Sequence, residues 1–522
     1  MEALTSGATQ AARRATGGAL VFVGFMGAGK SSAARSLAAE LGVEALDSDR
    51  ELEAELGEPI EAFFDREGEP AFRAREEEVV LRLLARPDAE VVALGGGAPG
   101  SDRVREALGA HTVVHLEIEA EDAWRRATGR GRPLARDRRR FDQLHGDREA
   151  LYASLADAVM PQAARDAVRR ALPALFALRE ARGRGLDLRM VWAEAESGSY
   201  PVFIGHGLIA GGFFHPDGVR RFVVTDANVA GMHRVAGEHT VAIGPGEERK
   251  TIATAESVLR ALARAGAERG DLLAAVGGGV VGDLAGFCAA IYQRGMSHVQ
   301  VSTTLVAQVD SAYGGKTGVD LPEGKNYAGV YHQPSAVVCD PAALETLPAE
   351  EHAAGYAEVL KTALIAGGPL WARVRSGGEV DEHTIVGCLR TKLATVAADE
   401  RDGGRRQVLN LGHTVGHAVE AATGYARYRH GEAVAVGLLA ALRLSGKDAL
   451  RREVAELLEA RGLPLSFSGA SVDDVIAQTQ RDKKRSGGRV PFVLVEAPGH
   501  VTPGRDVRPA DLRSAVEELR HG

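Results

Sequence analysis

The sequence contains few cysteines and no long apolar run. Its 522 residues include only three cysteines, and none of them belongs to a CxxC pair: Cys288, Cys339 and Cys388. Neither a disulfide framework nor a thiolate zinc site is therefore indicated, and a reducing cytoplasm fits this composition. No stretch reaches 18 consecutive apolar residues, so we expect no membrane-spanning helix.

An excess of positive charge is also missing. The chain has 63 lysines and arginines against 71 aspartates and glutamates, a net charge of −8. Because a nucleic-acid surface needs cations in excess to neutralise phosphates, we expect small-molecule partners and no nucleic acid. Residues 1–17 lack the apolar core of a signal peptide. We interpret them as a disordered tail, with a short transit peptide as the alternative.

Apolar segments, glycine turns and helical segments alternate along much of the chain. The stretch ALVFVGFMGAGKSSAARSLAAEL, for example, has a strand, a glycine loop and a helix in succession. This pattern predicts an α/β fold with parallel sheets and flanking helices. We predict an α/β domain at 18–176, a glycine- and arginine-rich linker at 177–186, a second α/β subdomain at 187–343 and an α-helical subdomain at 344–522.

The segment GFMGAGKS, residues 24–31, is a G-x4-G-K-[ST] motif between a predicted strand and a predicted helix. Its glycines let successive backbone N–H groups point into one concavity, to which the helix N-terminus adds partial positive charge. We expect Lys30 to reach the β- and γ-phosphates of ATP and Ser31 to ligate Mg²⁺. The predicted nucleotide site comprises Gly27, Ala28, Gly29, Lys30, Ser31 and Ser32.

Charged residues further along the first domain indicate the phosphate acceptor. Asp47 and Asp49 lie in DSD, Arg73 in FRARE, Arg132 in RPL and Arg148 in REALY. Arginine pairs bidentately with carboxylates and aspartate can accept a hydroxyl proton, which favours a small acceptor bearing both groups. The alternatives are a helix-capping role for the two aspartates and a solvated ion pair between Arg73 and a nearby glutamate.

Together with LGGGA at 94–98, these motifs resemble shikimate kinase in their order across residues 18–176. The resemblance implies ATP-dependent 3-phosphorylation of shikimate, in which Lys30, Asp49 and Arg132 are catalytic. It also implies that Asp47 supports Mg²⁺ through water and that Arg132 lies in a lid over ATP. The shikimate-binding residues would be Asp49, Arg73, Gly95, Gly96, Gly97 and Arg148.

A second group of motifs lies in the C-terminal part. GGGVVGDLAGF at 277–287 is not G-x-G-x-x-G, yet its glycines would let a pyrophosphate rest against backbone amides. STTLVAQVDSAYGGKTGVD at 302–320, LNLGHTVGHAVE at 409–420 and HGEAVAVG at 430–437 add cations, carboxylates and histidines. Imidazole and carboxylate without thiolate suit an open catalytic metal site, and the cations imply an anionic substrate.

His413 and His417 are four residues apart, on one face of a predicted helix. From this spacing alone, both would be metal ligands. The motifs of residues 187–522, however, resemble 3-dehydroquinate synthase, and that resemblance assigns zinc or cobalt to Glu358, His413 and His430. It places His417 against the substrate, near Asn410.

The same resemblance implies conversion of 3-deoxy-D-arabino-heptulosonate 7-phosphate to 3-dehydroquinate and phosphate, with NAD and no net redox change. The implied catalytic residues are Asp310, Lys316, Lys361, Arg406, Asn410 and His417. Further substrate contacts would be Arg294, Lys325, Asn326, Lys392, Lys483 and Lys484. The implied NAD site comprises Asp226, Asn228, Glu247, Lys250, Gly278, Gly279, Val280, Asp283, Thr303, Thr304, Lys325, Thr346 and Glu351, with helix capping as the alternative for Asp283.

The two resemblances together predict a bifunctional cytoplasmic enzyme of small-molecule metabolism. Its cofactors would be NAD, zinc or cobalt, and Mg²⁺ with ATP as the phosphoryl donor. The alternative is a related sugar-phosphate cyclase joined to a P-loop domain that senses nucleotide without catalysis. The oligomeric state stays open, although members of the synthase family often form homodimers through this domain.

Overall fold

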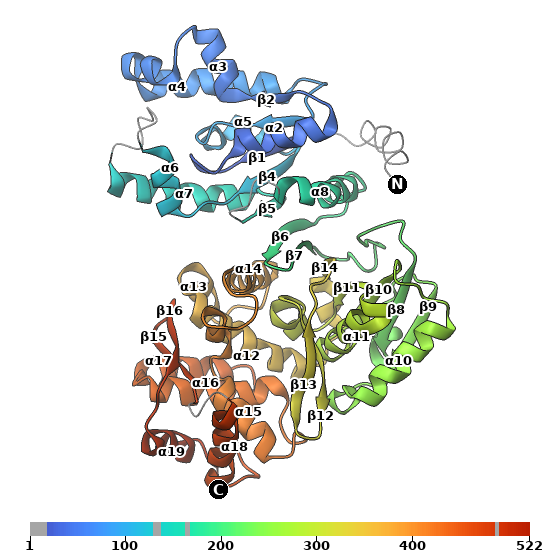
Figure 1. Ribbon diagram of the computed structural model, residues 1–522. Helices are drawn as coiled ribbons and strands as arrows, with labels where there is room; N and C mark the ends of the chain where they lie inside the picture. The colour runs from blue at the N-terminus through green and yellow to red at the C-terminus, as the bar shows by residue number, and fades with distance from the viewer. Residues whose placement is uncertain (1–17, 129–136, 162–166, 486–489, 522) are drawn as a thin grey trace. The chain divides into compact units, whose positions relative to one another are not determined.

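The computed structural model describes residues 18–128, 137–161, 167–485 and 490–521, without the side chains of 481–485 (Figure 1). The predicted tail at 1–17 lies outside this part of the chain, as do the predicted lid residue Arg132 and the side chains of Lys483 and Lys484. The chain forms two compact units. It passes from the first to the second through β6 (Arg189–Ala195) and β7 (Gly198–Ile204). Among the described residues, no helix has the length and hydropathy to cross a membrane.

The first unit contains a parallel sheet in the strand order β2-β3-β1-β4-β5. All four residues of β1 are buried, as expected of a central parallel strand covered on both faces. The strands are β1 (Leu20–Val23), β2 (Ala45–Asp47), β3 (Val91–Ala93), β4 (Thr112–Leu116) and β5 (Ala158–Met160). The helices are α2 (Lys30–Leu41), α3 (Ser48–Leu56), α4 (Ile60–Leu84), α5 (Asp102–Leu108), α6 (Ala120–Ala127), α7 (Arg138–Leu155) and α8 (Ala167–Gly183).

The segment predicted as a linker, 177–186, is largely helical. Helix α8 continues to Gly183, and the side chains of Leu175, Leu178 and Ala181 are fully buried. These three residues recur at helical spacing, so they share the face that packs on the first unit. The sequence shows an amphipathic stretch as far as Glu180, and the glycines and arginines that follow it led to the prediction of a linker.

The second unit begins with another parallel sheet, in the order β14-β11-β10-β8-β9. A β12–β13 hairpin packs on α11, as Figure 1 shows. The strands are β8 (Arg221–Asp226), β9 (His239–Ile243), β10 (Leu272–Gly277), β11 (Ser297–Ser302), β12 (Lys316–Leu321), β13 (Gly324–Tyr331) and β14 (Ala336–Cys339). The helices are α9 (Ala227–Ala230), α10 (Ile252–Arg264) and α11 (Gly279–Ile291). The predicted α/β class is confirmed.

Helices dominate the chain after β14, and one antiparallel hairpin interrupts them. They are α12 (Ala349–Ala366), α13 (Gly368–Arg375), α14 (Glu382–Ala398), α15 (His413–Ala422), α16 (His430–Leu444), α17 (Asp448–Glu459), α18 (Val472–Arg485) and α19 (Pro509–Glu518). The hairpin consists of β15 (Phe492–Ala497) and β16 (His500–Arg505).

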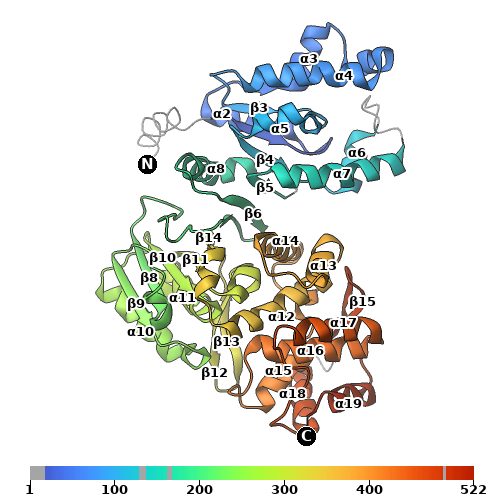
Figure 2. The ribbon, with the colours of Figure 1, turned by 180° about the vertical axis from the view of Figure 1, so that it is seen from behind.

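Helix α16 packs closely against both α12 and α15, and Figures 1 and 2 show the three helices as neighbours from opposite sides. Glycine makes this approach possible. A Cβ on Gly431 would lie 1.8 Å from the carbonyl oxygen of Ala354, and one on Gly437 would lie 1.9 Å from that of Gly412. Since both clashes are with backbone, neither could be relieved by rotating a side chain. These two glycines therefore determine how near the three helices stand.

Candidate functional sites

The P-loop has the backbone conformation that its glycines permit. Gly24, Gly27 and Gly29 have φ angles of 146°, 87° and 94°, a region that residues with a Cβ rarely adopt. Helix α2 starts at Lys30, directly after this loop. The Lys30 ammonium donates hydrogen bonds to the carbonyl oxygens of Gly24 and Phe25, at 2.8 and 3.3 Å. The loop therefore places a cation and a helix N-terminus at one concavity.

The glycine loop after β3 lies against the predicted acceptor residues. A Cβ on Gly95 would stand 2.5 Å from Asp49 Oδ1, and one on Gly97 would stand 1.9 Å from Arg73 Nη1. Arg73 in turn pairs with Glu76 at 2.5 Å. Because Glu76 is only 4% exposed, this pair is not the solvated one that was the alternative.

Arg148 approaches the same loop from α7. Its Nη1 would lie 3.7 Å from a Cβ on Gly96, whose carbonyl oxygen accepts a hydrogen bond from the buried Tyr152 hydroxyl at 2.5 Å. Burial raises the pKa of that hydroxyl, so it stays a donor. The structure thus brings Asp49, Arg73 and Arg148 together around one loop.

Asp47 caps helix α3. Its Oδ1 accepts hydrogen bonds from the backbone N–H groups of Asp49 and Arg50, at 3.1 and 3.4 Å. The capping alternative is therefore observed for Asp47, while α3 uses no side-chain oxygen of Asp49 as its cap. A water-mediated contact of Asp47 with Mg²⁺ stays a prediction.

Gly97→Ala is expected to raise the KM for shikimate about 10- to 100-fold, the cost of losing a hydrogen bond to a charged group. The new methyl group would displace the Arg73 guanidinium, although the φ of −91° at Gly97 itself suits alanine. Gly100→Ala is the matched control, because a Cβ there meets nothing within 4 Å. Steady-state kinetics in shikimate checks the pair. An unchanged KM in Gly97→Ala would show that Arg73 does not bind the substrate.

In the second unit, most of the predicted NAD residues gather at the carboxyl ends of the parallel strands. Asp226 ends β8 and caps α9, Gly278 caps α11 directly after β10, and Thr304 follows β11. A Cβ on Gly278 would lie 2.7 Å from the Thr304 side chain. This edge is where parallel α/β sheets bind ligands.

A buried ion pair lies beside this edge. Lys250 is 3% exposed, and its ammonium stands 2.7 Å from Asp283 Oδ2 and 3.6 Å from Glu247 Oε1. Burial alone would lower the pKa of Lys250, but the two carboxylates outweigh it and raise that pKa. Asp283 therefore pairs with lysine, and the capping alternative fails because Gly278 is the cap of α11.

The predicted substrate residue Arg294 and the predicted NAD residues Thr346 and Glu351 come from other segments. Arg294 precedes β11, at the amino end of the sheet. Glu351 pairs with Arg429 at 2.9 Å, and Thr346 meets His233 at 2.8 Å.

Three helices bring the predicted metal ligands together. Glu358 projects from α12, His413 from α15 and His430 from α16. Glu358 Oε1 lies 3.5 Å from His413 Nε2 and 3.3 Å from His430 Nε2. Two ligands of one tetrahedral zinc ion stand about 3.3–3.5 Å apart, so these separations suit a shared ion.

The surroundings of this cluster also fit a metal ion. Glu358 is fully buried; its Oε2 pairs with the Lys361 ammonium, while its Oε1 makes no hydrogen bond among the described residues and faces the two histidines. His413 Nδ1 lies 3.1 Å from the carbonyl oxygen of Leu411. Since a carbonyl only accepts, Nδ1 carries the hydrogen and Nε2 is left as the ligand atom.

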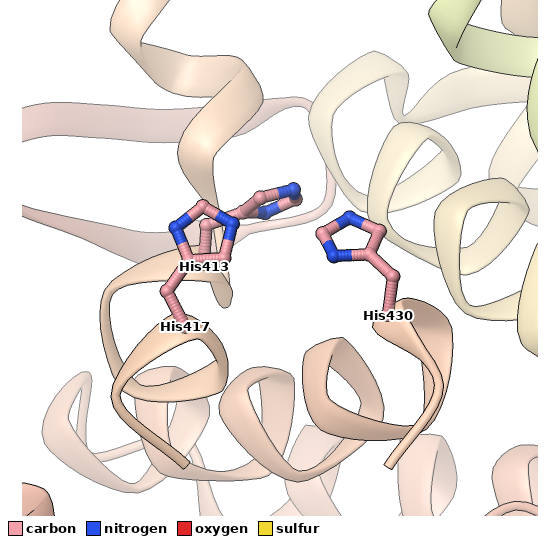
Figure 3. Close-up of side chains that lie close together, drawn as sticks. All are labelled: His413, His417 and His430. Atoms are coloured by element: carbon pink, nitrogen blue, oxygen red, sulfur yellow. The ribbon is translucent and has the colours of Figure 1, made fainter. Parts of the chain in front are cut away.

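The three histidines also stand close to one another, as Figure 3 shows. Ligand atoms of His413, His417 and His430 lie within 4.8 Å of one another. Two ligand sets therefore fit the geometry. One is His413, His417 and His430, in which His417 is a ligand as the spacing alone predicted, and the other is Glu358, His413 and His430. The choice between them stays a prediction.

Burial and charge act in opposite directions on these groups. Burial lowers the pKa of His413 to about 3, which leaves a neutral imidazole. Burial would also lower the pKa of His430, but the nearby Glu358 and Glu420 carboxylates raise it to about 10. Burial would raise the pKa of Glu358, but Lys361 and the histidines hold it well below its usual range.

Glu420 was not among the site residues predicted from the sequence. It is fully buried on α15, with its Oε2 3.5 Å from His430 Nδ1 and its Oε1 2.7 Å from the Lys325 ammonium. It thus orients a predicted ligand from the far side. A signal was available, because His413, His417 and Glu420 recur at i, i+4 and i+7 on one helical face.

Asp310 links two predicted substrate-binding lysines. Its carboxylate pairs with Lys361 at 3.2 Å and also with Lys392, and Lys361 further contacts Glu358. Lys316 is exposed and pairs with Asp402 at 2.6 Å. Asn410 and Asn326 are exposed near the ends of their elements.

Arg406, predicted to be catalytic, is only 1% exposed. Its guanidinium donates to the carbonyl oxygen of Gly314 at 3.0 Å and to that of Glu400. The residue therefore holds the Gly314–Gly315 loop in place, which the sequence did not indicate. Any contact with substrate stays a prediction.

These two sites define the class of protein. The P-loop beside an aspartate and two arginines is typical of a small-molecule phosphotransferase. The glutamate and histidines next to a parallel-sheet ligand edge are typical of a metal-dependent enzyme with a nucleotide cofactor.

Comparison with known proteins gives the families. Residues 26–175 match the shikimate kinase model, and residues 240–354 and 355–485 match the 3-dehydroquinate synthase N-terminal and C-terminal models. The 3-dehydroquinate synthase of Halorhodospira halophila is 40% identical over 353 residues, which cover 63% of this chain and 99% of that protein. The chain therefore belongs to the 3-dehydroquinate synthase family and carries a shikimate kinase domain ahead of it. The predicted bifunctional enzyme of the shikimate pathway is confirmed.

Solved structures agree on the fold. The 2-epi-5-epi-valiolone synthase of Streptomyces hygroscopicus subsp. jinggangensis, with NAD⁺ and Zn²⁺ bound, is 26% identical with a TM-score of 0.57, covering 63% of this chain and 98% of that one. A 2-deoxy-scyllo-inosose synthase with carbaglucose-6-phosphate, NAD⁺ and Co²⁺ is 23% identical with a TM-score of 0.54, covering 63% and 99%. The matches to synthase relatives and to the kinase model do not favour the alternative of a different cyclase with a non-catalytic P-loop.

Proposed function

We propose that Glu358, His413 and His430 hold the catalytic metal ion of the synthase, with Zn²⁺ as the resident ion and Co²⁺ as a substitute. The observation that carries this proposal is the approach of both histidine Nε2 atoms to one buried carboxylate oxygen, at 3.5 and 3.3 Å. The three ligands come from three helices whose distance apart is determined by Gly431 and Gly437. When bound, the ion would polarise substrate hydroxyls, and NAD would accept and then return a hydride.

The residues around the ion would bind and orient the anionic substrate. Lys361 and Lys392 meet at the Asp310 carboxylate, which keeps both ammonium groups in place at a buried site. Their charge suits the carboxylate and phosphate of a sugar-acid phosphate. His417, whose ring centroid lies 5.1 Å from that of His413, would face the substrate and move protons near its phosphate.

The same reasoning assigns NAD to the carboxyl edge of the β8–β11 sheet. Gly278 and Gly279 start α11, where backbone N–H groups can receive a pyrophosphate. The buried Lys250–Asp283 pair would hold this edge rigid beside the cofactor. Thr303 supports the assignment, because its buried hydroxyl has no hydrogen-bond partner among the described residues.

In the kinase, Lys30 and Ser31 would bind ATP and Mg²⁺, while Asp49 would accept the proton of the attacking shikimate hydroxyl. Arg73 and Arg148 would bind the shikimate carboxylate, because both guanidinium groups lie against the Gly95–Gly97 loop. We further propose catalytic domains at 18–176 and 187–522, the latter comprising an NAD subdomain to residue 343 and a metal subdomain from residue 344. A cytoplasmic homodimer joined through the synthase domain completes the proposal.

Paired assays on the purified full-length chain test this assignment of cofactors. We expect a strong chelator to stop phosphate release from the heptulosonate phosphate, and added Zn²⁺ or Co²⁺ to restore it. Shikimate-dependent ADP formation, measured with excess Mg²⁺ after the chelator is removed, should be unchanged by the treatment. Full synthase activity in a preparation shown to be metal-free would contradict the metal assignment.

A further inference from the structure

A second group of metal-ligating side chains lies in the kinase unit, and none of its members is a predicted ATP or shikimate contact. Ligand atoms of His115, Glu117 and Glu149 stand within 4.8 Å of one another. His115 lies near the carboxyl end of β4, Glu117 follows that strand directly, and Glu149 lies on α7. Among the described residues, this group and the three histidines of the synthase are the two such clusters.

His115 is fully buried, yet neither ring nitrogen has a hydrogen-bond partner among the described residues. Its Nε2 lies 3.3 Å from Glu149 Oε2. That separation equals the distance of about 3.3–3.5 Å between two ligands of a tetrahedral zinc ion. Glu149 Oε1 is likewise buried without a hydrogen-bond partner in the described part of the chain.

A simple ion pair does not account for this group. A contact between His115 Nε2 and Glu149 Oε2 leaves His115 Nδ1 and Glu149 Oε1 buried without hydrogen-bond partners in the described part of the chain. His145 is 3.8 Å from Glu149 Oε1, but its Nε2 lies 2.8 Å from the Ile118 carbonyl oxygen and so directs its hydrogen there. A divalent ion would coordinate the imidazole and the Glu149 carboxylate, with Glu117 within reach as a third ligand.

We propose that His115, Glu117 and Glu149 form a second divalent-metal site, in the kinase unit, that binds Zn²⁺ or another ion with a similar preference for imidazole and carboxylate ligands. One imidazole and two carboxylates are ligands that Zn²⁺, Co²⁺ and Mn²⁺ accept. The site is distinct from the P-loop, where the Mg²⁺ of ATP is expected.

The position of this site connects it to the kinase loops. The carbonyl oxygen of Leu116, between two of the ligands, would lie 2.5 Å from a Cβ on Gly24 of the P-loop. The ring of Tyr152, which binds the Gly96 carbonyl, lies 5.4 Å from that of His115. An ion there would tie α7 to β4 between the two loops that surround the kinase substrates.

Zinc stoichiometry on the full-length chain tests the proposal. Protein stripped with a chelator is dialysed against buffered Zn²⁺, and bound zinc is counted by elemental analysis. We expect two ions per chain in the wild type and one in Glu149→Gln, whose affinity at this site should fall more than about 100-fold, beyond the 10- to 100-fold effect of outer-shell changes. Glu121→Gln, which removes an exposed carboxylate of the same unit, is the control and should keep two.

Glu117→Gln provides a second variant should Glu149→Gln lose its fold, which circular dichroism would reveal. It is expected to lose the same single ion. If the folded variants bound as much zinc as the wild type, with the same affinity, the proposal would be overturned. His115 and Glu149 would then form a simple ion pair without a metal ion. Because Glu358→Gln removes the other ion in the same measurement, failure of the synthase assignment would be distinguishable from failure of this one.

Discussion

Glu358→Gln is expected to lower the rate of phosphate release by the synthase about 1,000-fold or more while leaving the kinase rate unchanged. An amide cannot supply the negative charge that Glu358 places between His413, His430 and Lys361. The metal ion contributes several kcal/mol to such reactions, and each 1.36 kcal/mol corresponds to about tenfold in rate. Phosphate release and metal content, measured on the same preparation, check this result.

Glu420→Gln is the graded comparison for that variant. Glu420 is equally buried but faces His430 Nδ1, on the side away from Glu358. Loss of such an outer partner lowers metal affinity or activity about 10- to 100-fold. Kinase activity of the same chains reports on the fold of the first unit, and circular dichroism reports on the fold of the whole chain. If Glu358→Gln were to keep its zinc and its rate, the metal would have to be bound by other residues, with the three histidines as the first candidates.

Lys30→Ala is expected to lower shikimate-dependent ADP formation about 1,000-fold, in line with the removal of one preorganised charge from a phosphoryl-transfer site. Lys30 lies at the start of α2, and its ammonium already points into the P-loop, 2.8 Å from the Gly24 carbonyl oxygen. The lost contact is strongest in the transition state, so kcat should fall more than the KM for ATP rises.

Arg35→Ala is the matched control for Lys30→Ala. It removes a cation from the same helix at an exposed position, where the side chain donates a hydrogen bond to Ser32 at 3.4 Å. We expect wild-type kinase activity in this variant and wild-type synthase activity in both. Wild-type protein without shikimate-dependent ADP formation would instead favour the nucleotide-sensing alternative for the P-loop.

Some features could be predicted because they depend on short stretches of backbone. The P-loop lies within residues 24–31, where glycine φ angles and the start of α2 follow from neighbouring residues. The same holds for the shared helical face of His413 and His417. Strand segments such as β1 could also be recognised, because an unbroken apolar run is typical of a buried parallel strand.

Other features had no local signal. Helix α8 extends into the predicted linker because Leu178 and Ala181 pack against the first unit, although arginine and glycine surround them. The resemblance implied a catalytic role for Arg406, but no local signal indicated that its buried guanidinium also binds the Gly314 carbonyl oxygen of a distant loop. Composition alone does not distinguish a cation that binds substrate from one that binds backbone.

The sequence by itself determined the α/β class, the two families and the residue types available for chemistry, because motifs and periodicity depend on local spacing. Only the tertiary structure decided which of those residues meet. Glu358 reaches His413 and His430 because glycines let α12, α15 and α16 approach at backbone distance, and His115 reaches Glu149 because α7 covers β4. Contacts of this kind join segments far apart in the chain, so they depend on helix and strand packing that no single stretch of sequence specifies.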